Sequence, residues 1–167
     1  MTLYVIRHGV AEEPSPGGDD ASRRLTAEGR TKMRAVAKGL RALDARFDVL
    51  LTSPLPRAAE TAAIVAEAFG GRLAPRELAA LAPGVGPAET LRRLRSVGQR
   101  GGVALVGHEP GLSHLVSLIL TGSPDALPLQ LKKGGVVVIE LDGVSPRAHG
   151  TLQAVLTPRA LRRLGRR

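Results

Sequence analysis

Residues 3–12 read LYVIRHGVAE, and the first four of them are apolar or aromatic residues that favour β structure. The run stops at Arg7, His8 and Gly9. An unbroken apolar run of this kind is typical of a strand that is buried on both faces of a parallel sheet. We therefore expect a guanidinium and an imidazole side by side at the carboxyl end of a buried strand.

Further along the chain, short apolar runs alternate with longer amphipathic segments. Residues 12–24 form a predicted loop rich in Pro, Gly and Asp, and Thr26 is a suitable N-cap for the helix that follows. The predicted strands cover residues 2–7, 48–53, 102–107, 133–143 and 150–158, the last two paired, and the predicted helices cover 26–43, 56–69, 87–97 and 111–122. This order indicates an α/β domain whose mostly parallel sheet is buried on both sides.

The composition is that of an ordinary globular protein. With 167 residues, 43% of them hydrophobic, the chain is long enough for one domain with a sizeable core. It has no cysteine for disulfides or thiolate chemistry, and no apolar run of the roughly 18 residues that span a bilayer. Because no signal-peptide pattern precedes the first strand, we expect a cytoplasmic protein that does not bind membranes.

The formal net charge is +9, and much of the excess lies in residues 91–100 and 157–167. Such a charge attracts anionic partners, including nucleic acid, phosphoproteins and membrane surfaces. An arginine-rich surface without a partner is the favoured alternative, because basic character alone specifies no partner and no stacking aromatics accompany it. A nucleic-acid partner is not expected. The segment 157–167 is predicted to form a short helix that docks through Leu161 and Leu164.

Polar residues follow three of the predicted strands, at the point where each strand ends. Ligands of open α/β sheets bind beyond the carboxyl ends of the strands, so these residues are expected to gather at one edge. Arg57 joins them from the first turn of a helix that Pro56 is suited to begin. The strand-end residues are Arg7, His8 and Gly9, then Thr52, Ser53 and Pro54, then Gly107, His108 and Glu109.

Two guanidiniums, two imidazoles and nearby helix N-termini form a pocket for a compact anion with several oxygens, and a phosphoryl group fits best. Binding alone does not require two histidines. A neutral imidazole, however, can attack phosphorus while its other nitrogen donates a hydrogen bond that fixes the tautomer. Gly9 allows close approach of the backbone, and the charged groups can stabilise the transferring phosphoryl oxygens. Taken singly, each residue could be an ordinary surface or buried polar residue. The residues after all three strands, however, are of types suited to binding and transferring a phosphoryl group.

A metal site is a weaker interpretation of the third strand end. His108 and His114 are six residues apart, which places them about 240° apart around a helix. A two-histidine zinc helix needs the i, i+4 spacing. Pro110 also indicates that His108 precedes the helix, so His114 is expected at the rim of the site rather than as a ligand.

The segments LYVIRHGVAE (3–12), TSPLPRAAETA (52–62) and LVGHEPGLSHL (105–115) resemble the motifs of the histidine phosphatase superfamily, also called the phosphoglycerate mutase-like family, in family order. The resemblance covers most of the chain. It is greatest to the small branch of SixA-type phosphohistidine phosphatases, because DASRRLTAEGR (20–30) is similar to that branch's Asp-x-x-Arg-Pro-Leu-Thr-x-x-Gly segment. Arg24 stands where the family usually has proline, so the start of the following helix is expected to differ.

The resemblance implies a three-layer α/β/α sandwich with a mostly parallel central sheet. It implies one histidine phosphatase domain over residues 1–167, ending in the basic C-terminal segment 157–167, and neither a metal nor an organic cofactor.

The resemblance also implies roles for single residues. His8 matches the nucleophile that is transiently phosphorylated, and His108 matches the second histidine, which binds the phosphoryl group and helps stabilise the transition state. Arg7 and Arg57 match the phosphate-binding arginines. Further candidates for substrate binding are Arg23, Ser53, Gly9 and Glu109.

One departure from ester-cleaving relatives concerns the acidic proton donor. Glu77 is present in RELAALAPGVG (76–86), but LAPG occupies the region where one large branch has its donor, and the SixA-like branch also lacks this acid. Expulsion of an alkoxide needs a proton, whereas an imidazole leaves more readily, so the site is biased toward P–N bonds or activated esters. Glu109 could imitate the donor of another branch, although a structural role at the helix start is favoured.

The sequence therefore predicts a phosphatase whose partner is a phosphohistidine-bearing protein, such as a phosphorelay or phosphotransferase carrier. A broad phosphomonoesterase for small phosphorylated molecules is the alternative within the enzymes. A non-catalytic adaptor that binds phosphate ion is the alternative outside them.

Overall fold

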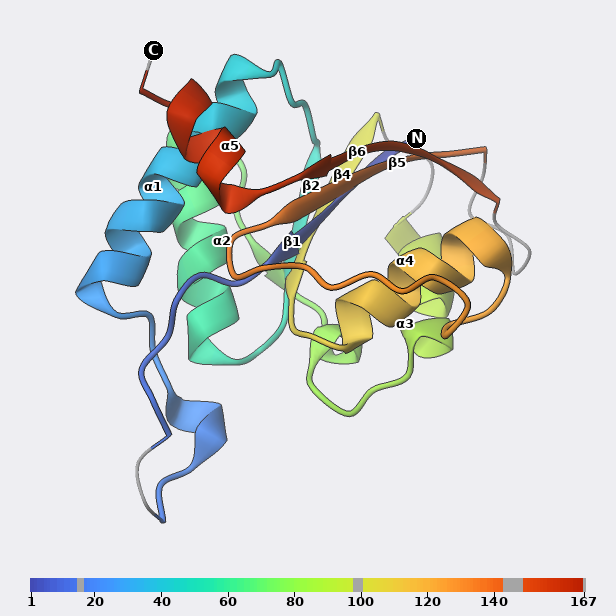
Figure 1. Ribbon diagram of the computed structural model, residues 1–167, viewed down its shortest axis with the longest axis horizontal. Coiled ribbons are helices and arrows are strands. Elements are labelled where there is room, and N and C mark those ends of the chain that lie inside the picture. Colours follow the sequence, from blue (N-terminus) through green and yellow to red (C-terminus); the bar gives the residue numbers. More distant parts are fainter. Residues whose placement is uncertain (15–16, 98–100, 143–148, 167) are drawn as a thin grey trace.

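The computed structural model describes residues 1–14, 17–97, 101–142 and 149–166, which form a twisted six-stranded sheet between two layers of helices (Figure 1). The strands are β1 (Thr2–Arg7), β2 (Val49–Thr52), β3 (Arg76–Glu77), β4 (Gly102–Gly107), β5 (Val136–Leu141) and β6 (Gly150–Leu156). They lie in the order β3-β2-β4-β1-β5-β6. The first four positions of this order are parallel, and β5 and β6 form an antiparallel edge. The predicted mostly parallel sheet and the predicted pairing of the last two strands are confirmed.

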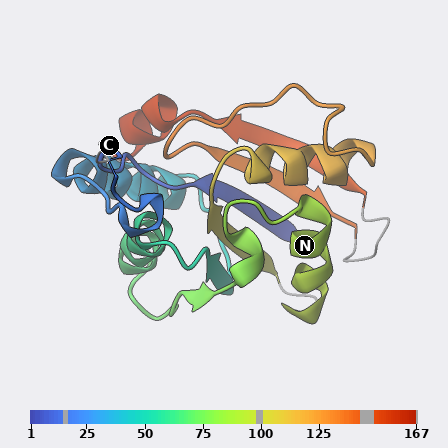
Figure 2. The same ribbon diagram turned by 90° about the horizontal axis from the view of Figure 1, so that it is seen from below.

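Helices cover both faces of the sheet (Figure 2). On one face lie α1 (Ala27–Ala42), α2 (Pro56–Ala68) and α5 (Pro158–Leu164), and on the other lie α3 (Pro87–Leu94) and α4 (Gly111–Thr121). Single 3₁₀ turns occur at η1 (Asp20–Ser22), η2 (Ala79–Leu81) and η3 (Arg95–Val97). The three-layer α/β/α architecture is therefore confirmed. No helix in these described residues is long and apolar enough to cross a membrane.

Side chains of β1 alternate between two apolar clusters. Tyr4 and Ile6 pack in the cluster under α1, α2 and α5, whereas Leu3 and Val5 pack in the cluster under α3 and α4. Because both faces are covered, burial favours an apolar residue at each of these positions, which explains the unbroken run.

The main differences from the predicted elements lie in three segments. The predicted helix over residues 87–97 is α-helical only to Leu94 and continues as η3, and β3 was not predicted because its two residues are exposed and carry no apolar pattern. The predicted strand over residues 133–143 begins only at Val136, because Gly134 has a positive φ of 78° and residues 132–135 form a turn. Residues 98–100 and 143–148, which include parts of the basic segment and of that strand, lie outside the described residues.

The turn before β5 is fastened to the end of β1. The amide of Gly134 donates to the carbonyls of Arg7 and His8, each at 3.1 Å. A left-handed residue is needed at this turn, and glycine adopts that conformation without a Cβ clash. The turn consequently lies against the residues that end the first strand.

The predicted N-cap of α1 and the predicted first residue of α2 are both observed. The Thr26 hydroxyl caps α1 by accepting a hydrogen bond from the Gly29 amide at 2.9 Å, and Pro56 is the first residue of α2. Arg24, at the position of the family's proline, forms an ion pair with Glu60 of α2 at 3.1 Å. The Glu60 carboxylate also accepts from the Leu25 amide, so α2 helps to hold the start of α1.

The basic C-terminal segment docks on the domain as predicted. Leu161 is fully buried and Leu164 is half-buried, and the backbone of α5 lies directly against α1. A Cβ atom built on Gly39 of α1 would lie 2.0 Å from the Leu161 carbonyl oxygen. Only glycine therefore fits at this crossing.

The helix crossing yields a prediction for stability. Ala has a higher helix propensity than Gly by about 1 kcal/mol, but Gly39→Ala forces a methyl group against backbone. We expect the free energy of unfolding in urea to fall by about 1–3 kcal/mol. The control is Gly111→Ala at the first position of α4, where an added Cβ meets no atom within 4 Å. Equal or greater stability of Gly39→Ala would contradict the close packing of α1 and α5.

Candidate active site

The carboxyl ends of β1 and β4 bring two histidines close together. His8 directly follows β1 and His108 directly follows β4, and their ring centroids are 4.9 Å apart with an interplanar angle of 54°. Both rings are buried, with only 5–6% of each residue exposed. The predicted meeting of the two imidazoles at one edge of the sheet is what the structure shows.

The His8 ring is held in one tautomer. Its Nδ1 lies 2.7 Å from the Gly9 carbonyl oxygen, and because a carbonyl only accepts, Nδ1 carries the hydrogen. Burial lowers the pKa of His8 to about 4 against the effect of that hydrogen bond, and the charges of Arg57, Arg7 and Lys133 lower it further. At neutral pH the imidazole is therefore uncharged and its Nε2 lone pair is free.

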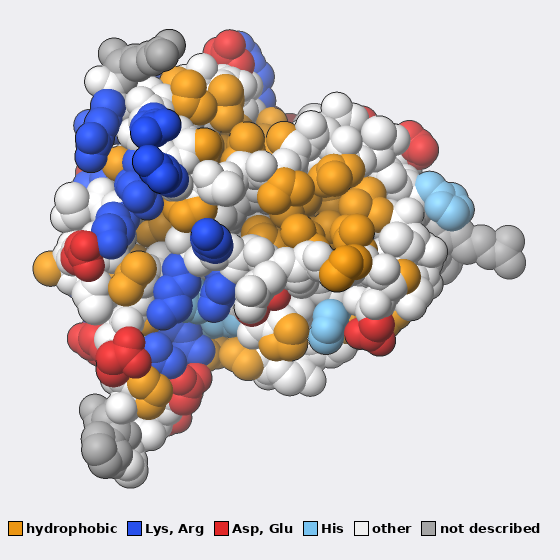
Figure 3. All heavy atoms as spheres, viewed as in Figure 1, with side chains coloured by type: hydrophobic (Ala, Val, Ile, Leu, Met, Phe, Trp, Pro, Cys, Tyr) orange, Lys and Arg blue, Asp and Glu red, His pale blue; other side chains and the backbone are white. Residues whose placement is uncertain are grey.

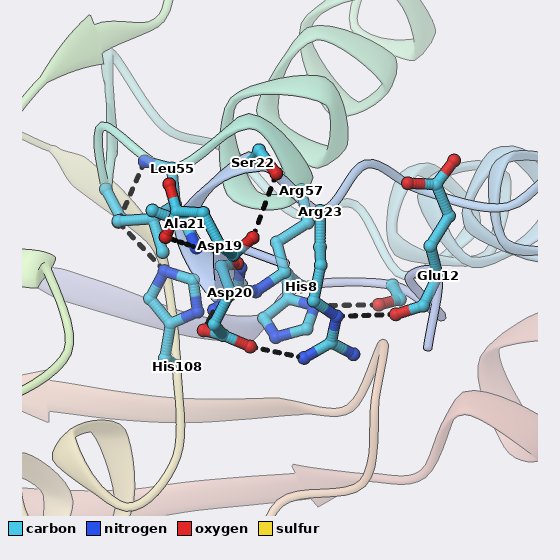
Figure 4. Close-up of polar contacts among 12 residues, drawn as sticks. His8, Glu12, Asp19, Asp20, Ala21, Ser22, Arg23, Leu55, Arg57 and His108 are labelled. Atoms are coloured by element: carbon cyan, nitrogen blue, oxygen red, sulfur yellow. Dashed lines mark hydrogen bonds and ion pairs between the residues drawn. The ribbon is translucent and has the colours of Figure 1, made fainter. Parts of the chain in front are cut away.

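Ser53 holds the His108 ring through a hydrogen bond to one ring nitrogen. The Nε2 atom of His108 lies 2.8 Å from the Ser53 hydroxyl, which also accepts from the Leu55 amide at 3.3 Å. Ser53 is fully buried, so it contacts the ring and not open space. The Nδ1 atom of His108 is buried without a hydrogen-bond partner among the described residues, and it points toward the space between His8 and Asp20 (Figure 4). Burial, followed by the charges of His8 and Arg57, lowers the pKa of His108 to about 3.

The two predicted arginines lie beside these rings. Arg57 is only 4% exposed, and its guanidinium donates to the backbone carbonyl and the carboxylate of Asp20 at 2.7 and 3.0 Å. Arg7 donates to the Leu131 carbonyl at 2.6 Å, and its Nε is buried without a partner among the described residues. Both guanidiniums act on the pKa of His8 and of His108, so the four predicted residues share one electrostatic environment.

Asp20, which the sequence analysis did not single out, lies between two arginines of this site. Its carboxylate accepts from Arg57 at 3.0 Å and from Arg23 at 2.6 Å (Figure 4). Arg23 is held in turn by the Glu12 carbonyl. The hydrogen bond from Arg23, aided by Arg57, keeps the pKa of Asp20 below its usual value. The structure thus places an anionic group where two guanidiniums converge.

Thr61 is another residue that the sequence analysis missed. Its hydroxyl accepts from the Gly9 amide at 3.1 Å and donates to the Arg57 carbonyl at 2.7 Å, which links the end of β1 to the first turn of α2. The signal available in the sequence was its position four residues after Arg57, on the same face of the helix.

Gly9 itself packs closely, since an added Cβ would lie 2.6 Å from the Met33 side chain. The Gly9 carbonyl orients the His8 ring, and the Gly9 amide donates to the Thr61 hydroxyl. Both backbone groups of this predicted substrate-binding residue are therefore engaged within the protein.

The two glutamates considered as proton donors lie in different places. One oxygen of the Glu109 carboxylate accepts from the Ser113 hydroxyl at 2.8 Å and from the Leu131 amide at 3.1 Å. Glu109 therefore holds the segment whose carbonyl binds Arg7. Glu77 is exposed in β3 and lines a separate cleft.

A cleft of about 230 Å³ opens beside His108. It lies between residues 80–87 and the start of α4, where His114 lines its wall. Glu109 is the one carboxylate among the residues that line it. Within the described part of the chain, no three His, Cys, Asp or Glu side chains are grouped as a metal site would require.

The lowered pKa values predict how the two rings titrate. At about pH 5, where a histidine of ordinary pKa is mostly charged, we expect His8 and His108 to stay neutral in NMR spectra of the ring atoms. Added tungstate should raise the pKa of His8, because an adjacent dianion favours the imidazolium. Assignment uses single His→Gln variants. A midpoint near 6.5 for either ring in the free protein would show that burial does not control its charge.

Several known proteins are similar to this chain in sequence or in fold. The model of the histidine phosphatase superfamily (branch 1) matches residues 3–82. An uncharacterized protein from Picosynechococcus sp. (strain PCC 7002) is 34% identical over 151 residues, which cover 89% of this chain and 90% of that protein.

Solved structures share the fold over nearly the whole chain. The protein histidine phosphatase SixA, complexed with tungstate, has a TM-score of 0.79 at 24% identity, covering 96% of this chain and 99% of that chain. A putative alpha-ribazole-5'-P phosphatase from Escherichia coli str. K-12 substr. MG1655 has a TM-score of 0.74 at 18% identity, covering 95% and 97%. The family model contains the first two motifs, and the shared fold extends through the third. The resemblance inferred from the motifs is confirmed: this chain is a phosphatase that belongs to the histidine phosphatase superfamily.

Proposed function

We propose that the chain removes phosphate from phosphohistidine in a protein, through a phosphohistidine intermediate on His8. The observation that carries the proposal is the hydrogen bond from His8 Nδ1 to the Gly9 carbonyl at 2.7 Å. It leaves Nε2 unprotonated on a neutral ring that faces His108 and lies near Arg7 and Arg57. This arrangement provides a nucleophile together with cations for the phosphoryl oxygens.

The proposed reaction has two displacements at phosphorus. In the first, Nε2 of His8 forms a bond to phosphorus while the P–N bond of the substrate breaks, and the substrate imidazole leaves with the electron pair and takes a proton from solvent. In the second, a water oxygen attacks phosphorus and loses a proton to solvent, the bond to His8 breaks, and phosphate is released as the lone pair returns to Nε2. Arg7, Arg57 and His108 stabilise the three phosphoryl oxygens in both steps.

Ser53 positions His108 in this scheme and does not touch substrate. The Ser53 hydroxyl accepts from the Leu55 amide and can donate its own hydrogen to His108 Nε2. The His108 hydrogen then lies on Nδ1, which faces the space beside His8. A donor at this place can bind an equatorial phosphoryl oxygen. Gly9 and Glu109 have positioning roles, for His8 and for the segment that binds Arg7.

Neither carboxylate near the site is suited to donate a proton, which favours a substrate whose leaving group departs readily. Glu109 is the one carboxylate lining the cleft beside His108, and one of its oxygens holds Ser113 and Leu131. Asp20 is kept ionised by Arg23, which makes it a poor proton donor. Because an alkoxide needs a proton in the transition state and an imidazole leaves more readily, the site favours P–N bonds over alkyl esters.

A broad phosphomonoesterase for small molecules is the second candidate. The observation that favours it is the cleft of about 230 Å³ beside His108, which has the size and the apolar walls to receive a small organic leaving group. The walls include Ala82, Val85 and Leu112.

A labelling experiment tests the intermediate. Incubation with ³²P-phosphoramidate should place acid-labile, alkali-stable label on His8, located by mass spectrometry, because phosphate on imidazole nitrogen is lost in acid. His8→Ala should take up no label. His149→Ala, which replaces an exposed histidine outside the site, should take up as much label as the wild type. Label in the His8→Ala protein contradicts the assignment of the nucleophile. A wild type that binds phosphate but takes up no label would indicate a non-catalytic adaptor.

Substrate preference is measured on the same protein. The kcat/KM for a phosphotransfer domain phosphorylated on histidine is compared with that for an alkyl phosphate. Faster hydrolysis of the alkyl ester would favour the second candidate. It would also show that the site can protonate an alkoxide leaving group, contrary to our inference that it has no proton donor.

The position of Asp20 predicts tighter binding of anions when its charge is removed. Asp20 neutralises Arg57 and Arg23, so an entering oxyanion has to replace it. We expect Asp20→Asn to lower the dissociation constant of tungstate by about threefold to tenfold, measured by calorimetry. Glu13→Gln, in the same exposed loop, is the control for net charge. Weaker binding in Asp20→Asn would mean that the carboxylate holds the arginines in place for the ligand and does not compete with it.

A further inference from the structure

We propose that a basic cleft next to the active site docks an acidic, partly apolar segment of the phosphoprotein substrate. The proposal rests on the proposed function and names the surface that selects the protein. The cleft has a volume of about 370 Å³ and lies between α1, the turn before β5 and α5. Arg7 and Gly9 line one end of it, so the cleft opens directly beside the phosphoryl site.

The rim of this cleft carries an excess of positive charge. Besides Arg7, four cationic side chains line it: Lys32, Lys132, Lys133 and Arg162. Figure 3 shows Lys and Arg side chains gathered in a band on this face, over α1 and α5. No Asp or Glu is among the described residues that line the cleft, although Glu28 pairs with Lys32 at 2.7 Å and has its pKa lowered first by Lys32 and then by Arg162. A single carboxylate does not balance these cations, so the cleft is suited to an anionic occupant.

The cleft and the reacting histidine are electrostatically connected. Lys133 is one of the charges that lower the pKa of His8, although burial and the two arginines have larger or comparable effects. The turn that carries Lys132 and Lys133 is bound to the Arg7 and His8 carbonyls through the Gly134 amide. Whatever occupies the cleft is therefore held next to His8, which accepts the phosphoryl group in the proposed reaction.

The floor of the cleft indicates which kind of anion fits. Val10, Met33, Val36 and Pro158 line it, so the occupant has apolar as well as acidic groups. A polypeptide segment with acidic side chains around an apolar anchor has this character. Single-stranded nucleic acid is disfavoured, because the chain has one Tyr, two Phe and no Trp, and these three rings pack in or against the core. The cleft therefore fits an acidic protein surface next to a phosphohistidine.

The experiment reverses charge in the cleft without changing residues of the phosphoryl site. The variant Lys132→Glu/Arg162→Glu is compared with Arg46→Glu/Arg72→Glu, which makes the same change in net charge on exposed arginines outside the cleft. The neutral pair Lys132→Gln/Arg162→Gln serves if the charge reversal impairs folding, which a melting curve reports. The probes are an acidic phosphotransfer domain, phosphorylated on histidine, and p-nitrophenyl phosphate.

We expect the cleft variant to lower kcat/KM for the phosphoprotein by about tenfold at low salt, mainly through KM, and to change hydrolysis of p-nitrophenyl phosphate less than about twofold. The difference should shrink as salt rises from about 50 to about 300 mM, because exposed charges are screened. Equal losses on both substrates, or the same loss in the control variant, would overturn the docking surface.

Binding of the unphosphorylated domain, measured by fluorescence anisotropy, separates the docking surface from the catalytic proposal. Binding that is weakened only in the cleft variant supports docking even if the wild type releases no phosphate, and in that case the proposed function fails alone. Binding that is unchanged in the cleft variant overturns docking alone. Displacement of the domain by an oligonucleotide, with tighter binding of the oligonucleotide, would assign the cleft to nucleic acid and also overturn the proposal.

Discussion

The in-register parallel pairing of β1 with β4 is the constraint on which the rest of the site depends. Arg7 lies opposite Gly107, and the His8 amide donates to the Gly107 carbonyl at 3.1 Å, so the pairing continues one residue beyond β1. This register places His8 and His108 at the same height, 4.9 Å apart. A slip by one residue would turn every side chain of β1 to the other face. Because both faces of β1 are filled with fitted apolar side chains, the packing of the core fixes the distance between the imidazoles.

Charge balance is the second condition that the fold meets at this edge. Burial keeps the two imidazoles neutral, so the positive charge resides on the guanidiniums. A guanidinium as buried as that of Arg57 needs an opposite charge, since an unpaired buried ion costs several kcal/mol. Asp20 supplies that charge from a loop in which its side chain is 59% exposed. A counter-ion on an exposed loop can be replaced, whereas a carboxylate built into the core could not, and the site is thus stable when empty and open to an oxyanion.

Local patterns predicted much of this arrangement, and long-range contacts account for what they missed. Apolar runs and caps such as Thr26 are encoded within a few residues, so the element order and the strand-end residues could be predicted. The roles of His8, His108 and the arginines in the reaction stay predictions. The pairing of Asp20 with Arg57 spans 37 positions, and the Thr61 contact with Gly9 spans 52. Such contacts depend on how the elements pack and cannot be inferred from local sequence. Strand β3 was missed for a similar reason: its two exposed residues have no hydrophobic pattern, and only pairing with β2 makes them a strand.

The turn of residues 131–134 lies between the proposed phosphoryl site and the proposed docking cleft. Its backbone binds Arg7 and the end of β1, Glu109 fixes its first amide, and its two lysines face the basic cleft. Since several hydrogen bonds hold the turn before any partner arrives, a docked protein meets a preorganised surface. Contacts made there are equally strong before and during phosphoryl transfer, and uniform binding of that kind lowers KM without raising kcat. In the proposed scheme the cleft therefore selects which phosphoprotein is presented, whereas the buried histidines and arginines set the rate of transfer.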